Sequence, residues 1–221
     1  MWKIIFVLSC IFSINVYSQS VVQATIKSIS GKSTLTSYGG LFSSLFGIGG
    51  ETTNTSTSQE LVFKDTISVE SGKVDLVTNK GVNISVLDSS SYVIGLQNMG
   101  ELEYGEVYYN GNIPFKIQLG HTSVQVKGTE FLISYQGSKL KNGVYVVKGE
   151  LELKEAFSFS KIQVSAGEQY IFEEGEVTKL DSKIKNYIET KLRGKEIPKG
   201  IQNQDNNDWD EPYCECENYC Y

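Results

Sequence analysis

Three cysteines close to the end of the chain have the type and spacing best suited to chemistry. Cys214, Cys216 and Cys220 form a Cys-x-Cys-x-x-x-Cys pattern. Three thiols leave one over after a disulfide forms, either free or available to another chain. A zinc site takes four ligands, so the cysteines with Glu215 or Glu217 fit one only in part. The pattern favours a disulfide or an intermolecular crosslink, with an unpaired thiol tail and a metal site as alternatives.

Other side chains that could carry catalysis are scarce. His121 is the only histidine of the chain and Arg193 its only arginine. A lone histidine makes neither a catalytic triad nor a metal cluster, and we expect it on the surface or in a turn. Nucleophile elbows, phosphate-binding loops and His-rich metal spacings are missing from the sequence. We therefore expect no enzyme, no cofactor and no metal.

The acidic charge is concentrated at the end of the chain. The net charge is −6, and residues 201–221 hold six acids without a lysine or arginine. The rest of the chain is close to neutral and shows no basic cluster, which argues against a nucleic-acid partner.

The first eighteen residues predict export. Lys3 precedes an apolar run at 4–16, and a small residue, Ser18, precedes Gln19. These are the parts of a cleaved signal peptide, here 1–18, and the run is shorter than the roughly 20 residues of a membrane helix. An uncleaved anchor and a lipoprotein at Cys10 are the alternatives. We expect a periplasmic or extracellular protein with no stable membrane span.

Period-two alternation then dominates the chain. Residues 19–58 predict a strand at 21–26 and a flexible Ser/Thr/Gly-rich loop, which contains an apolar stretch at 41–48. Residues 59–180 predict an all-β domain, built as a sandwich- or solenoid-like stack of short antiparallel strands. The alternating apolar sets are Val74/Leu76, Val82/Ile84/Val86, Val124/Val126, Phe131/Ile133/Tyr135, Leu151/Leu153 and Ile162/Val164.

Glycine-glutamate pairs recur through this body, as at Gly105-Glu106 and Gly149-Glu150. Glycine suits reversals of the chain, so we expect these pairs at turns, with solvated acids. Asp181 predicts the cap of a short helix within 181–195, with Ile184, Ile188 and Leu192 on one stripe. The polar stretch 196–221 predicts a disordered, acidic, cysteine-containing tail.

The order of phrases along the body resembles the FecR domain family. The most specific phrase is the family hallmark Val-x-Gly-Thr-x-Phe, here Val126, Gly128, Thr129 and Phe131. Read from its residues alone, Gly128 allows a tight bend between two strands and Phe131 returns to the core. The phrases that accompany it are Gly-Lys-Val-Asp-Leu at 72–76, Gly-Glu-Val-Tyr-Tyr at 105–109, Pro-Phe-Lys-Ile at 114–117, Val-Val-Lys-Gly-Glu-Leu at 146–151 and Val-Ser-Ala-Gly-Glu-Gln at 164–169.

The resemblance implies extracytoplasmic signalling. Proteins similar to FecR carry a cytoplasmic segment that controls a sigma factor, and their outer part receives a signal from a TonB-dependent transporter. Only residues 1–3 precede the apolar run here, so we expect a domain without the cytoplasmic segment. The expected function is an exported, non-enzymatic FecR-like binding or signal-sensing module of the cell envelope, with an envelope protein or a glycan as partner. The alternative is a structural surface or matrix component, crosslinked through its C-terminal cysteines into a disulfide-linked oligomer.

Overall fold

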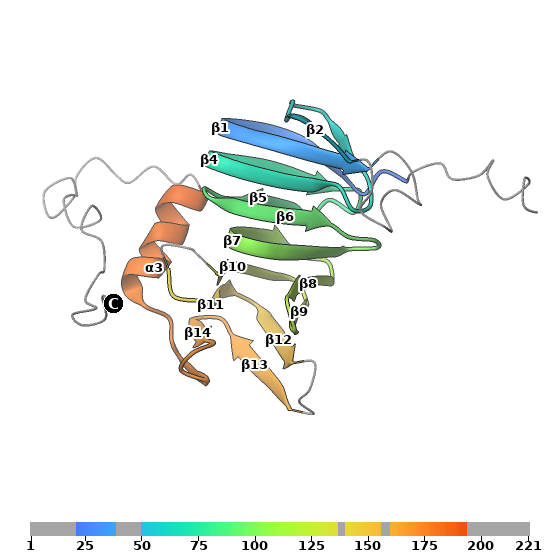
Figure 1. Ribbon diagram of the computed structural model, residues 1–221. Coiled ribbons are helices and arrows are strands. Elements are labelled where there is room, and N and C mark those ends of the chain that lie inside the picture. The colour runs from blue at the N-terminus through green and yellow to red at the C-terminus, as the bar shows by residue number, and fades with distance from the viewer. Residues whose placement is uncertain (1–20, 39–49, 137–139, 156–159, 194–221) are drawn as a thin grey trace, which may run out of the picture.

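The computed structural model describes residues 21–38, 50–136, 140–155 and 160–193. In these residues fifteen strands form one continuous sheet, followed by a short helix (Figure 1). The strands are β1 (Ala24–Tyr38), β2 (Gly50–Asn54), β3 (Glu60–Leu61), β4 (Thr66–Thr78), β5 (Asn83–Val86), β6 (Ser90–Ile94), β7 (Met99–Gly111), β8 (Phe115–Leu119), β9 (Thr122–Val126), β10 (Thr129–Tyr135), β11 (Gly143–Lys148), β12 (Glu150–Glu155), β13 (Lys161–Ser165), β14 (Glu168–Ile171) and β15 (Glu176–Lys179).

Three long strands fold this sheet into two layers. The end of β4 pairs with β5, whereas its beginning pairs with β6. β7 divides in the same way, pairing with β6 first and with β5 later. β1 follows β4 through both layers. We call the layer that contains β5 the helix-side layer and the layer that contains β6 the far layer.

Strands then follow one another down the stack almost in sequence order (Figure 1). Below β7 the helix-side layer continues with β10, β11, β14 and β15. The far layer continues with β8, β9, β12 and β13. All of these pairings are antiparallel except that between β7 and β8.

The corner where β1 and β4 pass between the layers depends on two glycines. Gly31 and Gly72 are cross-strand partners, with φ of 87° and 83°. A Cβ atom on Gly31 would lie 2.0 Å from the carbonyl oxygen of Ser71, and one on Gly72 would lie 2.1 Å from that of Ser30. Only glycine fits here, because the backbones approach too closely for a side chain and the left-handed conformation disfavours one.

The main hydrophobic core lies between the two layers. Inward positions of both layers supply it, including fully buried Val74 and Phe131 of the helix-side layer and Ile67 and Ile117 of the far layer. The alternation seen in the sequence is the alternation of inward and outward side chains along each strand. The expected all-β stack of antiparallel strands with one short C-terminal helix is therefore confirmed.

A short helix covers the outer face of the helix-side layer. Asp181 caps α3 (Ser182–Tyr187), and its side chain accepts hydrogen bonds from the backbone of Lys183 and Ile184. The π-helix η2 (Ile188–Leu192) continues α3. Ile188 is fully buried in a second cluster, which also contains Tyr108, Leu132 and Tyr145 of the sheet. The expected stripe of Ile184, Ile188 and Leu192 packs in this cluster.

Two local expectations differ from the structure. Residues 30–38 and 50–54 were expected in a flexible loop, but they belong to β1 and β2, which pair with each other. Leu35 faces the core while β-branched threonines line the outer face, so this Ser/Thr-rich sequence suits a strand. Gly105-Glu106 lies inside β7 rather than at a turn, and Glu106 is buried. The predicted signal peptide, the apolar stretch 41–48 and the tail 196–221 lie outside the described residues.

Candidate functional site

A polar groove of about 290 Å³ opens on the outer face of the helix-side layer. Strands β1, β4, β5 and β7 form its floor, and the end of η2 forms one wall. Its lining is mostly polar and of mixed charge: Lys27, Ser28, Lys73, Asp75, Leu76, Asn83, Ile84, Ser85, Tyr108, Asn110, Leu192 and Arg193.

Strand register explains why these side chains meet. Ser28 lies opposite Asp75, Asp75 opposite Ser85, and Ser85 opposite Tyr108. Outward side chains on neighbouring strands form rows across a sheet. This row leads from the polar groove to Tyr108, and then to Leu132 under the helix. The groove and the helix contact therefore share one row of the sheet.

Asp75 is the fixed anion of the groove floor. It accepts hydrogen bonds of 2.6 Å from the hydroxyl groups of both Ser28 and Ser85, and its Oδ2 lies 3.0 Å from Lys73 Nζ. Burial raises the pKa of Asp75, but the three hydrogen bonds and the charge of Lys73 together lower it below its ordinary value. The carboxylate therefore stays ionised and has its donors already in place.

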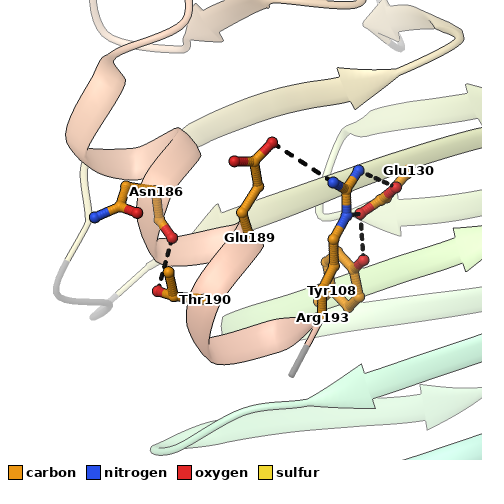
Figure 2. Close-up of polar contacts among 6 residues, drawn as sticks. All are labelled: Tyr108, Glu130, Asn186, Glu189, Thr190 and Arg193. Carbon is orange, nitrogen blue, oxygen red and sulfur yellow. Dashed lines mark hydrogen bonds and ion pairs between the residues drawn. The ribbon is translucent and has the colours of Figure 1, made fainter. Parts of the chain in front are cut away.

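A second polar cluster ties the end of η2 to the sheet (Figure 2). The Arg193 guanidinium donates to both carboxylate oxygens of Glu130, and the hydroxyl group of Tyr108 donates to Glu130 at 2.5 Å. Glu189 lies 3.5 Å from the same guanidinium. A planar guanidinium that holds a carboxylate through two hydrogen bonds is a geometrically specific pair. It fixes the last described turn of the chain beside the groove.

Ionisation within this cluster is also fixed. Burial raises the pKa of Glu130, but the hydrogen bonds from Arg193 and Tyr108, with the charges of Arg193 and Lys148, lower it overall. The hydrogen bond to Glu130 raises the pKa of Arg193. Burial and the contact with Glu130 raise the pKa of Tyr108. General acid–base catalysis needs a group that titrates near the working pH. The pKa values of Asp75 and Glu130 are instead lowered and that of Tyr108 is raised, so these three groups keep one charge state near neutral pH, which suits binding.

The four named residues of the hallmark phrase, Val126, Gly128, Thr129 and Phe131, lie outside the groove, at the passage from β9 to β10. Val126 and Phe131 are buried in the main core, and the Phe131 ring lies 5.0 Å from that of Tyr109. Gly128 has a φ of 67°, and the hydroxyl group of Thr129 donates to the carbonyl of Glu150 at 2.7 Å. All four residues shape the corner between the layers, and none of them lines the groove.

The other residues predicted to do chemistry are not brought together. His121 is exposed in the turn between β8 and β9. Cys214, Cys216 and Cys220 lie outside the described residues, so their crosslinking stays a prediction. Over the described ranges, no group of three His, Cys, Asp or Glu side chains is placed to hold a metal ion. None of the described helices is long and apolar enough to cross a membrane.

Sequence reasoning missed the pair of Glu130 and Arg193. Glu130 stands inside the hallmark phrase, and Arg193 is the only arginine of the chain, but 63 residues separate them. The one available signal was a single arginine at the end of a predicted amphipathic helix. That signal does not say which of the many acids on the sheet is its partner.

By fold, the chain is an all-β protein with a polar groove beside a C-terminal helix. No family model matches it, and no curated protein matches it. Two crystal structures of a candidate anti-sigma factor from Parabacteroides distasonis are similar. The first has 22% identity and a TM-score of 0.46, covering 58% of this chain and 65% of that one. The second has 22% identity and a TM-score of 0.45, covering 56% and 63%.

This chain therefore spans just under two thirds of the length of those structures. A likeness at this level of identity concerns the fold alone, so the activity assigned to those proteins is not carried over to this chain. Membership of the FecR family stays a prediction.

Proposed function

We propose that this protein is an exported, non-enzymatic module of the cell envelope that binds another envelope protein and signals its presence. The sequence resemblance to the FecR domain supports the envelope setting. The groove supports binding, because its hydroxyl, amide and charged groups suit the polar surface of a protein partner.

One observation carries the signalling part of the proposal. The groove is bounded both by the sheet and by the end of η2, through Leu192 and Arg193. A partner seated there would contact both elements. It would also lie next to the pair of Arg193 and Glu130, which holds the helix end to the sheet. Occupancy of the groove is therefore linked to the contact between the end of η2 and the sheet.

The test is complementation of a gene deletion, with envelope-dependent transcription as the readout. Asn83 is an exposed groove residue on β5, so Asn83→Trp fills the groove without touching the core. Gln125→Trp is the matched control, because Gln125 is an exposed strand residue on β9 of the far layer. We expect the wild type and Gln125→Trp to restore the transcriptional response, and Asn83→Trp to fail.

The proposal is wrong if the deletion leaves envelope-dependent transcription unchanged, or if Asn83→Trp restores it fully. Export is checked separately by cell fractionation and by N-terminal sequencing of the mature protein, which we expect to begin at Gln19. A wild-type protein retained in the cytoplasm would contradict the export part alone. Specific binding of a cell-surface glycan to the groove would show that the partner is a glycan and not a protein.

A further inference from the structure

A small cavity lies between the two layers, away from the polar groove. Its volume is about 10 Å³, and its walls include Ala24 and Ile84 of the helix-side layer and Phe115 of the far layer. A space of this size holds one water molecule and nothing larger. Apolar cavities of this kind stay dry, so the polar groups in the wall decide what it contains.

Two residues of this wall each have one buried side-chain atom with no hydrogen-bond partner among the described residues. These atoms are the hydroxyl oxygen of Tyr92 and the side-chain carbonyl oxygen of Asn98. Tyr92 lies on β6 and is 1% exposed, and Asn98 lies in the turn between β6 and β7. Nearly all buried polar groups of native proteins are hydrogen-bonded, and leaving one unpaired is costly. Since both residues line the same small cavity, one molecule inside it is the simplest partner for both atoms.

One of the two atoms can donate a hydrogen bond and the other can accept one, so a single small molecule between them could pair with both. Burial, and to a lesser degree the charge of Tyr109, raise the pKa of Tyr92, so its hydroxyl group keeps its proton and can donate. The carbonyl oxygen of Asn98 can only accept. A water molecule accepts one hydrogen bond and donates another at the same time, so it satisfies both atoms.

Gln23 forms another part of the cavity wall. The side-chain amide of Gln23 donates to the Val21 carbonyl at 2.9 Å, and its oxygen accepts from the Gln97 backbone at 3.3 Å. Gln23 thereby bridges the start of the described chain to the turn that contains Asn98.

We propose that Tyr92 and Asn98 bind one buried water molecule between the two layers. The water joins the β6–β7 turn to the interior of the stack. That turn carries the exposed apolar side chain of Leu96, and exposed Met99 follows it at the start of β7. The bound water is therefore a structural ligand of this turn, and the site is independent of the proposed function of the groove.

The test combines a double-mutant cycle with direct observation of the water, both in the full mature chain. Tyr92→Phe removes the donor, and Asn98→Gly removes the acceptor while tolerating the φ of 62° at this position. We expect Tyr92→Phe to raise the unfolding equilibrium constant roughly five-fold, as for the loss of an ordinary hydrogen bond. The double variant should lose less stability than the sum of the losses in the two single variants, because each single variant already releases the same water.

Tyr109→Phe is the matched control. Tyr109 is equally buried, but its hydroxyl group donates directly to the Ile113 carbonyl at 3.0 Å, so its loss should not depend on Asn98. A crystal structure at high resolution should show a density peak within hydrogen-bonding distance of both Tyr92 and Asn98. The proposal is overturned if Tyr92→Phe stabilises the protein, as expected for a dry cavity. Strictly additive losses or an empty cavity in the density map overturn it equally.

Discussion

Replacing Gly31 by alanine separates the two demands that the corner of the stack makes on its backbone. The first demand is the left-handed φ of 87°, which costs an alanine about 1 kcal/mol. The second is space, because the new Cβ would lie 2.0 Å from the carbonyl oxygen of Ser71. Relieving such an overlap costs about 1–3 kcal/mol. We therefore expect Gly31→Ala to destabilise the protein by about 2–4 kcal/mol.

Gly81→Ala is the control for the backbone conformation alone. Gly81 has a φ of 82°, and apart from its two chain neighbours no residue has an atom within 4 Å of the position of its Cβ. Gly81→Ala should lose about 1 kcal/mol of stability, and urea denaturation of both variants measures the difference between them. The reasoning about the corner is refuted if Gly31→Ala is no less stable than Gly81→Ala.

Three further predictions follow from single groups. Asp181→Ala removes the N-cap of α3 and should destabilise the protein by about 1 kcal/mol, and Asp181→Asn should destabilise it by less. Urea denaturation distinguishes the two variants, and equal losses of stability would count against a cap. The pKa of Glu130 is lower in the folded protein than in the unfolded chain, so its ionised carboxylate stabilises the fold at pH values above the unfolded-state pKa. This stabilisation is lost as the pH falls through the pKa of the folded state. The stability difference between wild type and Glu130→Gln should therefore shrink on acidification, and a constant difference would contradict the pairing. Non-reducing gels of the oxidised protein should show multimers that disappear when the three tail cysteines become serine, whereas a monomer throughout would exclude crosslinking.

Much of the fold could be predicted because the period-two pattern has a direct physical cause. Val74 and Leu76, or Leu151 and Leu153, alternate in sequence since every second side chain of a strand points to the core. The capped helix could also be predicted, because Asp181 directly precedes the segment that contains the apolar stripe of Ile184, Ile188 and Leu192. These signals are local, so a single sequence contains them in full.

The alternation pattern predicted strands, but it did not predict that the long strands pass from one layer to the other. Gly31 and Gly72 look like ordinary turn residues in the sequence, but they pair with each other across a corner that continues both strands. Glu106 was expected in solvent after such a glycine, yet it is buried within β7. A glycine with positive φ is compatible both with a turn that reverses the chain and with a corner inside a continuous strand. Only the pairing with the neighbouring strand shows which of the two is present.

The groove depended on strand register, which the sequence did not provide. Asp75 meets Ser28 and Ser85 because three strands pair in one particular alignment, and a shift by one residue would turn each side chain to the other face. The pair of Glu130 and Arg193 needed in addition the direction in which the helix returns across the sheet.

The order of strands in the stack has a consequence for how the chain reaches this structure. After β4, each newly made strand joins the edge left by strands that came before it, in both layers. A chain that emerges N-terminus first can therefore fold progressively, as stacked repeats do, without waiting for its final residues. The growing edge must stay open until the end of that process. It finishes with the short strands β13 and β15, where Lys161, Glu176 and Lys179 place charges that discourage pairing with a second nascent chain.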